Sequence, residues 1–146
     1  MQKTNGGFLI SQIKQVQGRV FEKMLLDSGI DEFNGAQGRI LYVLWQKDNL
    51  PIVELSRQTG LAKTTLTSML DRIESNGHIQ RLYDKTDRRK VRIVLTEKAR
   101  NLSDKYTQVS EEMTKLFYEG FSEEEIISFE DKLKRILNNL TEGVFN

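Results

Sequence analysis

The sequence predicts a mainly α-helical chain with one small β-hairpin, and three observations lead to this prediction. Apolar residues recur at spacings of three and four through most of the 146 residues, which is the period of an α-helix. Between residues 79 and 95 the pattern changes to the alternation of β-strands. Gly, Asn or Pro stands where the helical period breaks off, as at helix ends. We therefore expect six helices and a two-stranded hairpin.

The first two helices are expected over residues 8–26 and from Asn34 onward. Ser28 and Gly29 end the first helix, whose apolar stripe contains Leu9, Ile13, Val16, Val20 and Met24. Asn34 is a capping residue, and Gln37 follows it at the spacing of a capping box. The buried face of the second helix is predicted to consist of Ile40, Leu41, Leu44 and Trp45.

Two shorter helices follow a Pro-containing break at residues 48–51. The first is expected at 52–59 and ends at Gly60, and the second is expected at 63–75 with a stop signal at 76–77. The apolar face of the second contains Leu66, Met69, Leu70 and Ile73. Its other face offers Lys63, Thr64, Thr65, Thr67, Ser68 and Arg72. A helix that needed only solubility would favour Glu, Lys and Gln over Thr, so the short hydroxyls indicate contact with base edges and phosphates.

The hairpin carries the most informative residues of the chain. Its predicted strands are 79–83 and 91–95, and the adjacent cations Arg88, Arg89 and Lys90 stand at the tip between them. A hairpin that only completes a core does not need three adjacent charges, whereas one that enters a phosphate-lined groove does. Helix, glycine turn, helix and basic hairpin together make a winged helix-turn-helix, so we expect duplex DNA as the ligand. The predicted DNA contacts are Lys63, Thr64, Thr65, Thr67, Ser68, Arg72, Asp87, Arg88, Arg89 and Lys90.

The distribution of charge agrees with DNA binding although the net charge is only +1. Residues 56–92 carry nine cations against four acids, whereas the rest of the chain carries 13 cations against 17 acids. Positive charge is therefore concentrated where the DNA-binding pattern lies, and the distribution matters more than the sum.

The C-terminal part of the chain predicts a dimer. One long helix is expected over residues 96–120, with the apolar seam Ala99, Leu102, Tyr106, Val109, Met113 and Leu116. Ser122 and Glu125 then open a last helix with a capping box. The first, fifth and sixth helices have more apolar surface than a small lobe can cover, so a second copy of the chain is expected to cover it. The predicted interface residues are Leu9, Ile13, Ile126, Phe129, Leu133, Ile136 and Leu140.

These elements predict one domain over residues 1–146. Within it we expect a DNA-binding lobe at 34–95 and dimerisation helices at 8–27 and 96–141.

The composition argues against several other classes of protein. Because the chain has no Cys, it has no disulfide framework, thiolate metal site or thiol switch. The single His, His78, is expected at the surface or half-buried, without a catalytic or metal role. There is no Gly-rich phosphate loop and no HExxH, so we expect no enzyme activity, no cofactor and no bound metal. No apolar run approaches ~18 residues and the N-terminus lacks a secretory signal, so a cytoplasmic location without membrane contact is expected.

Residues 54–102 resemble the MarR family of bacterial winged-helix regulators. The resemblance rests on the order and spacing of Glu54-Leu55-Ser56, Thr59-Gly60-Leu61, the run from Thr64 to Glu74, Asn76-Gly77, Arg81, Asp87-Arg88-Arg89 and Leu95-Thr96-Glu97-Lys98-Ala99. It implies a homodimer that regulates transcription from a pseudo-palindromic operator, usually as a repressor released by a small ligand.

The resemblance also implies roles for single residues. The helix at 63–75 would enter the major groove, Arg89 positioned by Asp87 would enter the minor groove, and Asp71 would pair with a wing arginine. Two positions depart from the family pattern: Ala62 replaces the usual Asp or Ser cap, and Ser68 replaces a frequent cation.

Some alternatives stay open at this point. By resemblance, a small aromatic or hydrophobic effector would bind where the first, second and fifth helices meet the DNA-binding lobe. Phe8, Tyr42 and Trp45 are candidates for lining that pocket, with simple core packing as the alternative. For the whole chain, the alternatives are a winged-helix module that contacts only proteins and a transcriptional activator.

Overall fold

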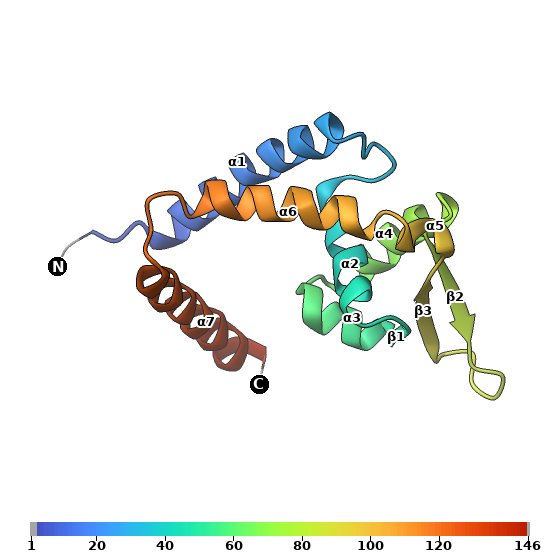
Figure 1. The fold of residues 1–146 in the computed structure, drawn as a ribbon. Coiled ribbons are helices and arrows are strands. Elements are labelled where there is room, and N and C mark those ends of the chain that lie inside the picture. The colour runs from blue at the N-terminus through green and yellow to red at the C-terminus, as the bar shows by residue number, and fades with distance from the viewer. Residues whose placement is uncertain (1–2, 146) are drawn as a thin grey trace. The chain divides into compact units, whose positions relative to one another are not determined.

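The computed structural model describes residues 3–145, and Figure 1 shows their order along the chain. One compact unit ends at Ser110 and a second begins at Glu111. The helices are α1 (Gly6–Asp27), α2 (Gly35–Gln46), α3 (Ile52–Thr59), α4 (Lys63–Ser75), α5 (Glu97–Arg100), α6 (Ser103–Phe117) and α7 (Glu123–Phe145). The strands are β1 (Leu50–Pro51), β2 (Ile79–Tyr83) and β3 (Val91–Leu95). The chain is therefore mainly helical with a small β-sheet, as the sequence predicts.

Local sequence signals position most element ends correctly. Asn34 and Gln37 form the predicted capping box at the start of α2, with bonds of 2.8 and 3.1 Å. Gly60 follows α3 with a φ of +73°, and Gly77 follows α4 with a φ of +84°. A side chain is strained at such angles, so glycine at these two positions defines where each helix stops. The bounds of α3, α4, β2 and β3 agree with the prediction.

The sheet has one strand more than predicted. Its order is β1-β3-β2 with both pairings antiparallel, and Leu50 of β1 lies opposite Ile93 of β3. The prediction of residues 48–51 as a plain break was therefore wrong. A two-residue edge strand ending in Pro51 has no alternating pattern to recognise, and an edge is where a sheet tolerates proline. Strand β1 joins the entrance of α3 to the base of the hairpin.

The prediction of one continuous helix over residues 96–120 was also wrong, because the chain breaks between α5 and α6. Trp45 donates from its indole Nε1 to the carbonyl oxygen of Ala99 at 3.0 Å. In an unbroken helix that oxygen would accept from the amide of Ser103, four residues later. Here it accepts instead from Leu102 at 3.1 Å, which is a tighter turn. The break between α5 and α6 therefore coincides with a contact from α2 to the Ala99 carbonyl.

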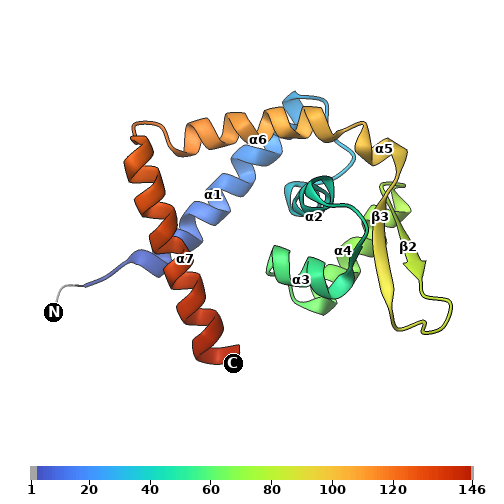
Figure 2. The same ribbon diagram turned by 60° about the horizontal axis from the view of Figure 1, so that its bottom comes forward.

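The core of the first unit lies among α2, α3, α4 and the sheet, which Figures 1 and 2 show gathered around α2. Gly38 on α2 allows the ring of Tyr106 to lie close against the helix. His78 is fully buried in this unit, so the prediction of a surface or half-buried residue was wrong. The side chains without exposed surface include Ile40, Leu41, Leu44, Leu55, Leu66, Leu70, Ile73 and Ile93.

The second unit consists of the end of α6 and all of α7. The predicted capping box opens α7, with Ser122 and Glu125 bonded at 2.9 and 3.1 Å. Tyr118 contacts the rings of Phe117, Phe121 and Phe129. Several large apolar side chains of α7 remain exposed: Ile127, Ile136, Leu137, Leu140 and Val144. Within residues 3–145, no helix combines the length and the apolar character needed to cross a bilayer.

Candidate nucleic-acid interface

Helix α4 is held by one face and exposed on the other. The turn before it is fixed by Gly60 and by Ser56, whose hydroxyl donates to the carbonyl of Leu61 at 2.7 Å. The buried face presents Leu66, Leu70 and Ile73 to the core. The exposed side chains are Lys63, Thr64, Thr65, Thr67, Ser68 and Arg72. All six predicted contact residues of α4 are therefore accessible to a ligand.

The first turn of α4 has no side-chain cap. Ala62 occupies the capping position and makes no capping bond, as its side chain predicts. Backbone N–H groups at such a helix start attract anions. One turn later, the Thr67 hydroxyl donates to the Lys63 carbonyl at 2.8 Å. Because this bond uses the hydroxyl hydrogen, the Thr67 hydroxyl can offer a ligand only an acceptor.

Asp84 organises the tip of the wing, where the wing is β2, β3 and the connecting residues 84–90. Its Oδ1 accepts from the Thr86 amide at 2.7 Å, the Thr86 hydroxyl at 2.5 Å and the Asp87 amide at 3.1 Å. These bonds, led by that of the Thr86 hydroxyl, lower the pKa of Asp84. The Asp84 and Lys90 backbones close the tip with a bond of 3.0 Å. Asp84 was not among the predicted site residues.

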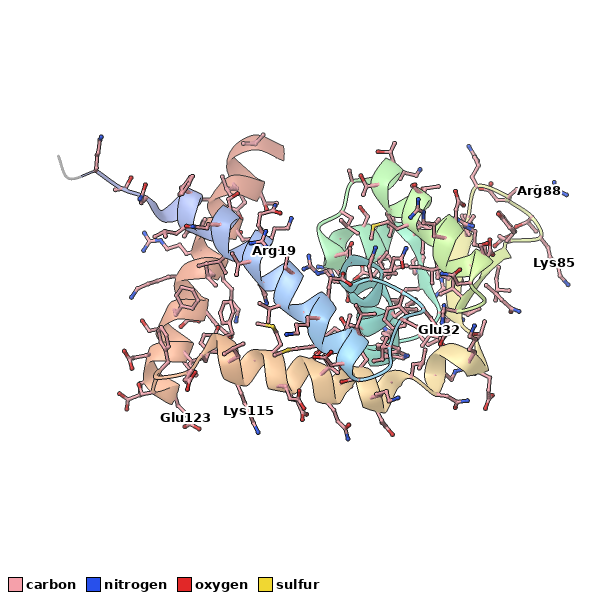
Figure 3. All side chains as sticks on the ribbon, turned by 90° about the horizontal axis from the view of Figure 1, so that it is seen from above. Arg19, Glu32, Lys85, Arg88, Lys115 and Glu123 are labelled. Carbon is pink, nitrogen blue, oxygen red and sulfur yellow. The ribbon has the colours of Figure 1, made fainter. Side chains whose placement is uncertain are left out.

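Arg89 is oriented by Asp87 in a two-point contact. Arg89 Nε lies 3.0 Å from Asp87 Oδ1 and Nη2 lies 3.3 Å from Oδ2, while the side chain of Arg89 remains 91% exposed. The hydrogen bond from Arg89 lowers the pKa of Asp87. In Figure 3 the side chains of Lys85 and Arg88 project outward from the same tip. Lys85 was missing from the predicted contacts, although the sequence places it in the same charged run.

Arg81 joins the wing to α4. Its Nη2 lies 2.7 Å from Asp71 and its Nη1 lies 2.7 Å from Glu74, both on α4. Its Nη2 also donates to the Thr67 carbonyl at 3.3 Å, and its amide donates to Glu74 at 3.1 Å. Only 11% of the Arg81 side chain is exposed. The wing arginine that pairs with Asp71 is therefore Arg81 in the middle of β2, and the bonds hold the wing against the exposed face of α4.

The three candidate effector residues do not share one environment. Tyr42 and Trp45 both contact Tyr106, with ring centroids 6.3 and 5.0 Å apart. Phe8 is 68% exposed near the start of α1, and no ring contact joins it to the others within residues 3–145. A hollow of about 610 Å³ lies among α1, the α1–α2 loop, α2 and α4, and none of the three lines it. The effector site therefore stays a prediction.

The exposed helix after a glycine turn and the basic hairpin tied to it define a winged helix-turn-helix protein. The model of the MarR family matches residues 33–91, which hold α2, α3, α4 and most of the wing. Residues 33–91 therefore contain a MarR-family domain.

This chain is similar to two curated relatives in sequence and to one solved structure in fold. The transcriptional regulator TtmR of Methylorubrum extorquens (strain PA1) is 36% identical over 88 residues, which are 60% of this chain and 44% of TtmR. The uncharacterised regulator YsmB of Bacillus subtilis (strain 168) is 31% identical over 97 residues, 66% of either chain. A mutant of Escherichia coli MarR in complex with operator DNA superposes with a TM-score of 0.79 at 26% identity, covering 94% of this chain and 99% of that one. The chain thus spans less than half the length of TtmR and about two thirds of YsmB.

Proposed function

We propose that this chain is a sequence-specific regulator of transcription that binds duplex DNA. The observation that carries the proposal is the Arg81 junction, which fixes a basic wing beside the exposed polar face of α4. Two elements held in this way can contact adjacent grooves without first being ordered. The operator complex of the related Escherichia coli protein supports the same use of this fold.

In the proposed complex, α4 lies in the major groove and the wing reaches a minor groove. The hydroxyls of Thr64, Thr65 and Ser68 would meet base edges or phosphates, while Thr67 would accept a hydrogen bond only. Arg89 would enter the narrow groove, where negative potential is concentrated. The remaining predicted contacts would bind phosphates or orient neighbouring side chains. They are Lys63, Arg72, Asp87, Arg88 and Lys90.

The proposed active form is a homodimer built through α1 and α7. Leu9 and Ile13 on α1 are 48% and 44% exposed, and Ile136 and Leu140 on α7 are 44% and 60% exposed. Ile126, Phe129 and Leu133 lie half-buried along α7. Large apolar side chains in rows of this kind usually face another protein surface. A two-fold dimer would set two copies of α4 about one DNA turn, ~34 Å, apart on a pseudo-palindromic site.

We further propose that the protein acts as a repressor and that a small aromatic or hydrophobic effector releases it from the operator. An effector needs to favour the non-binding form by only about 1–3 kcal/mol to have this effect.

The test uses a labelled duplex from just upstream of the protein's own coding region and a shuffled duplex of the same composition. Fluorescence anisotropy should show salt-dependent binding with a clear preference for the upstream duplex, and footprinting should show two half-sites. Equal affinity for both duplexes would contradict sequence-specific regulation. A reporter gene under this upstream region separates repression from activation.

A further inference from the structure

The side chain of His78 has an unusual environment in the winged-helix unit. It has no exposed surface, and neither ring nitrogen has a hydrogen-bond partner within the described residues. Gln37, the other buried polar side chain there, accepts a bond from Asn34. A neutral imidazole always carries one N–H, so this ring keeps a buried donor unpaired. An unpaired buried group of this kind calls for an explanation.

His78 connects the two elements proposed to bind DNA. Its amide donates to the carbonyl of Ile73 in α4 at 3.0 Å, and strand β2 of the wing starts at the next residue. Its own carbonyl accepts from the amide of Thr96, just before α5, at 3.0 Å. A displacement of His78 would therefore disturb the end of α4, the start of the wing and the start of α5.

Two charged side chains face the ring. Glu32, which Figure 3 labels on the α1–α2 loop, has Oε1 3.7 Å from His78 Nε2. The ammonium of Lys98 on α5 lies 2.8 Å from the same oxygen and donates to the Asn76 carbonyl at 3.0 Å. Asn76, which follows α4, donates to the Glu32 carbonyl at 3.1 Å. The other close contact is uncharged: the ring of Phe33 meets the imidazole edge-on at 5.5 Å.

A proton on His78 would disturb this arrangement. Both nitrogens would then be donors, and Nε2 would compete with Lys98 for the Glu32 carboxylate. Nδ1 would stay unpaired in a buried site. Burial lowers the pKa of His78; Glu32 opposes this effect and Lys98 adds to it. The protonated ring is therefore better accommodated once it has moved out of its site.

We propose that His78 makes DNA binding sensitive to mild acid, because proton uptake displaces the ring from its buried site beside Phe33 and Glu32 and loosens the end of α4 and the start of β2. This inference rests on the proposed DNA-binding function. His78 is the only His of the chain, and there is no Cys, so few other groups change charge near pH 6. Linkage of one proton limits the loss of affinity to about tenfold per pH unit.

The first experiment measures affinity for the upstream duplex by anisotropy between pH 7.5 and pH 5.5 at constant ionic strength. His78→Gln keeps a polar side chain that cannot titrate in this range. The wild-type dissociation constant should rise severalfold, but by less than about tenfold, over these two pH units, while that of His78→Gln changes less than about twofold. Parallel pH profiles for the two proteins would overturn the proposal.

The second experiment needs no DNA, and its main readout uses the wild-type protein. The NMR signal of the single His should titrate with a midpoint below its usual 6.5. The fluorescence emission of Trp45, the only Trp, should change with the same midpoint. The reason is that Phe33 lies beside both rings, with its ring centroid 6.5 Å from that of Trp45 and 5.5 Å from that of His78. Glu32→Gln removes the opposing carboxylate and should move the midpoint to lower pH.

These readouts separate the two proposals. If the wild type binds no duplex at any pH, the proposed function fails, and the NMR and Trp45 midpoints still decide whether the proton displaces the ring. A midpoint of the His78 titration at or above pH 6.5 would overturn the switch even if DNA binds. Trp45 emission that does not change as His78 titrates would do the same.

Discussion

Arg81 and Asp71 form an ion pair 2.7 Å long that ties the first strand of the wing to α4. Glu74 and the Thr67 carbonyl hold the same guanidinium, so three groups of α4 bind one side chain of β2. The angle between wing and helix is thus set inside the protein by a planar group with several fixed donors.

Arg81→Lys should disturb this junction. A lysine keeps the charge but cannot bond Asp71 and Glu74 in the same geometry, so we expect a loss of about 1–3 kcal/mol of stability and weaker DNA binding. Arg57→Lys is the matched control, because Arg57 pairs with Glu54 at a site 71% exposed, where loss of an ion pair should change stability little. Chemical denaturation measures both. Equal, small losses for the two variants would show that the junction is not structural.

Arg89→Ala should weaken operator binding strongly without changing the melting temperature, because within residues 3–145 the Arg89 side chain is hydrogen-bonded to Asp87 alone, at the exposed tip. Lys90→Ala should cost less and reduce the salt slope by about 0.9 for a lost phosphate contact. Arg19→Ala is the control, since Figure 3 shows Arg19 on α1, well apart from the wing tip. Anisotropy across a salt series distinguishes the three. Wild-type affinity in Arg89→Ala would exclude the wing from the groove.

Gly38→Ala should destabilise the first unit by about 1–3 kcal/mol, because overpacking a buried contact forces rings to shift. The added Cβ would stand 2.6 Å from a ring carbon of Tyr106 and 3.1 Å from one of Phe33. Gly18→Ala on α1 meets nothing within 4 Å and should instead stabilise by up to about 1 kcal/mol. Thermal melting measures whether each variant loses or gains stability. A neutral Gly38→Ala would mean that the packing around Tyr106 is loose.

Leu140→Glu should convert the proposed dimer to a monomer. Leu140 is 60% exposed in the single chain, so the substitution should leave the fold of α7 intact while burying a charge in the interface. Asn138→Glu adds the same carboxylate on the opposite face of α7 and should remain dimeric. Sedimentation equilibrium decides the outcome. A dimeric Leu140→Glu protein would place the interface elsewhere.

The stability of the first unit should fall as the pH drops below about 6.5. Burial lowers the pKa of His78 in the folded state, so the unfolded chain takes up the proton first. The stabilisation is complete above the unfolded pKa of 6.5 and is lost below it. Asp84 and Asp87, whose pKa values are also lowered, act only in a more acidic range. Calorimetry at pH 7.5, 6.5 and 5.5 should show a decline that His78→Gln removes.

Local chemistry explains what the sequence predicted well. The capping box of Asn34 and Gln37 fixes one helix start, and the positive φ angles of Gly60 and Gly77 fix two helix ends. Each of these signals involves only a few neighbouring residues, so it can be recognised in the sequence. The exposed face of α4 follows in the same way from a helical period with apolar residues on one side.

The errors come from contacts between distant residues. At the helix break, the Ala99 carbonyl binds the indole of Trp45 from 54 positions away, and no local residue there forbids a continuous helix. The burial of His78 depends on Phe33 and on the loop that carries Glu32, neither of which is near it in sequence. The resemblance included Arg81 and implied that a wing arginine pairs with Asp71, but choosing Arg81 as that partner required knowing which face of α4 lies beside β2.

The bonds of Asp84 also bear on the kinetics of recognition. A loop that had to be ordered on contact would lose conformational entropy at each side chain, roughly 0.5–1.5 kcal/mol apiece. Here the carboxylate of Asp84 has already closed the tip, and Asp87 already aims Arg89. Most collisions with DNA would therefore present a wing in its binding shape, and association should be limited by diffusion and charge, not by a search among loop conformations.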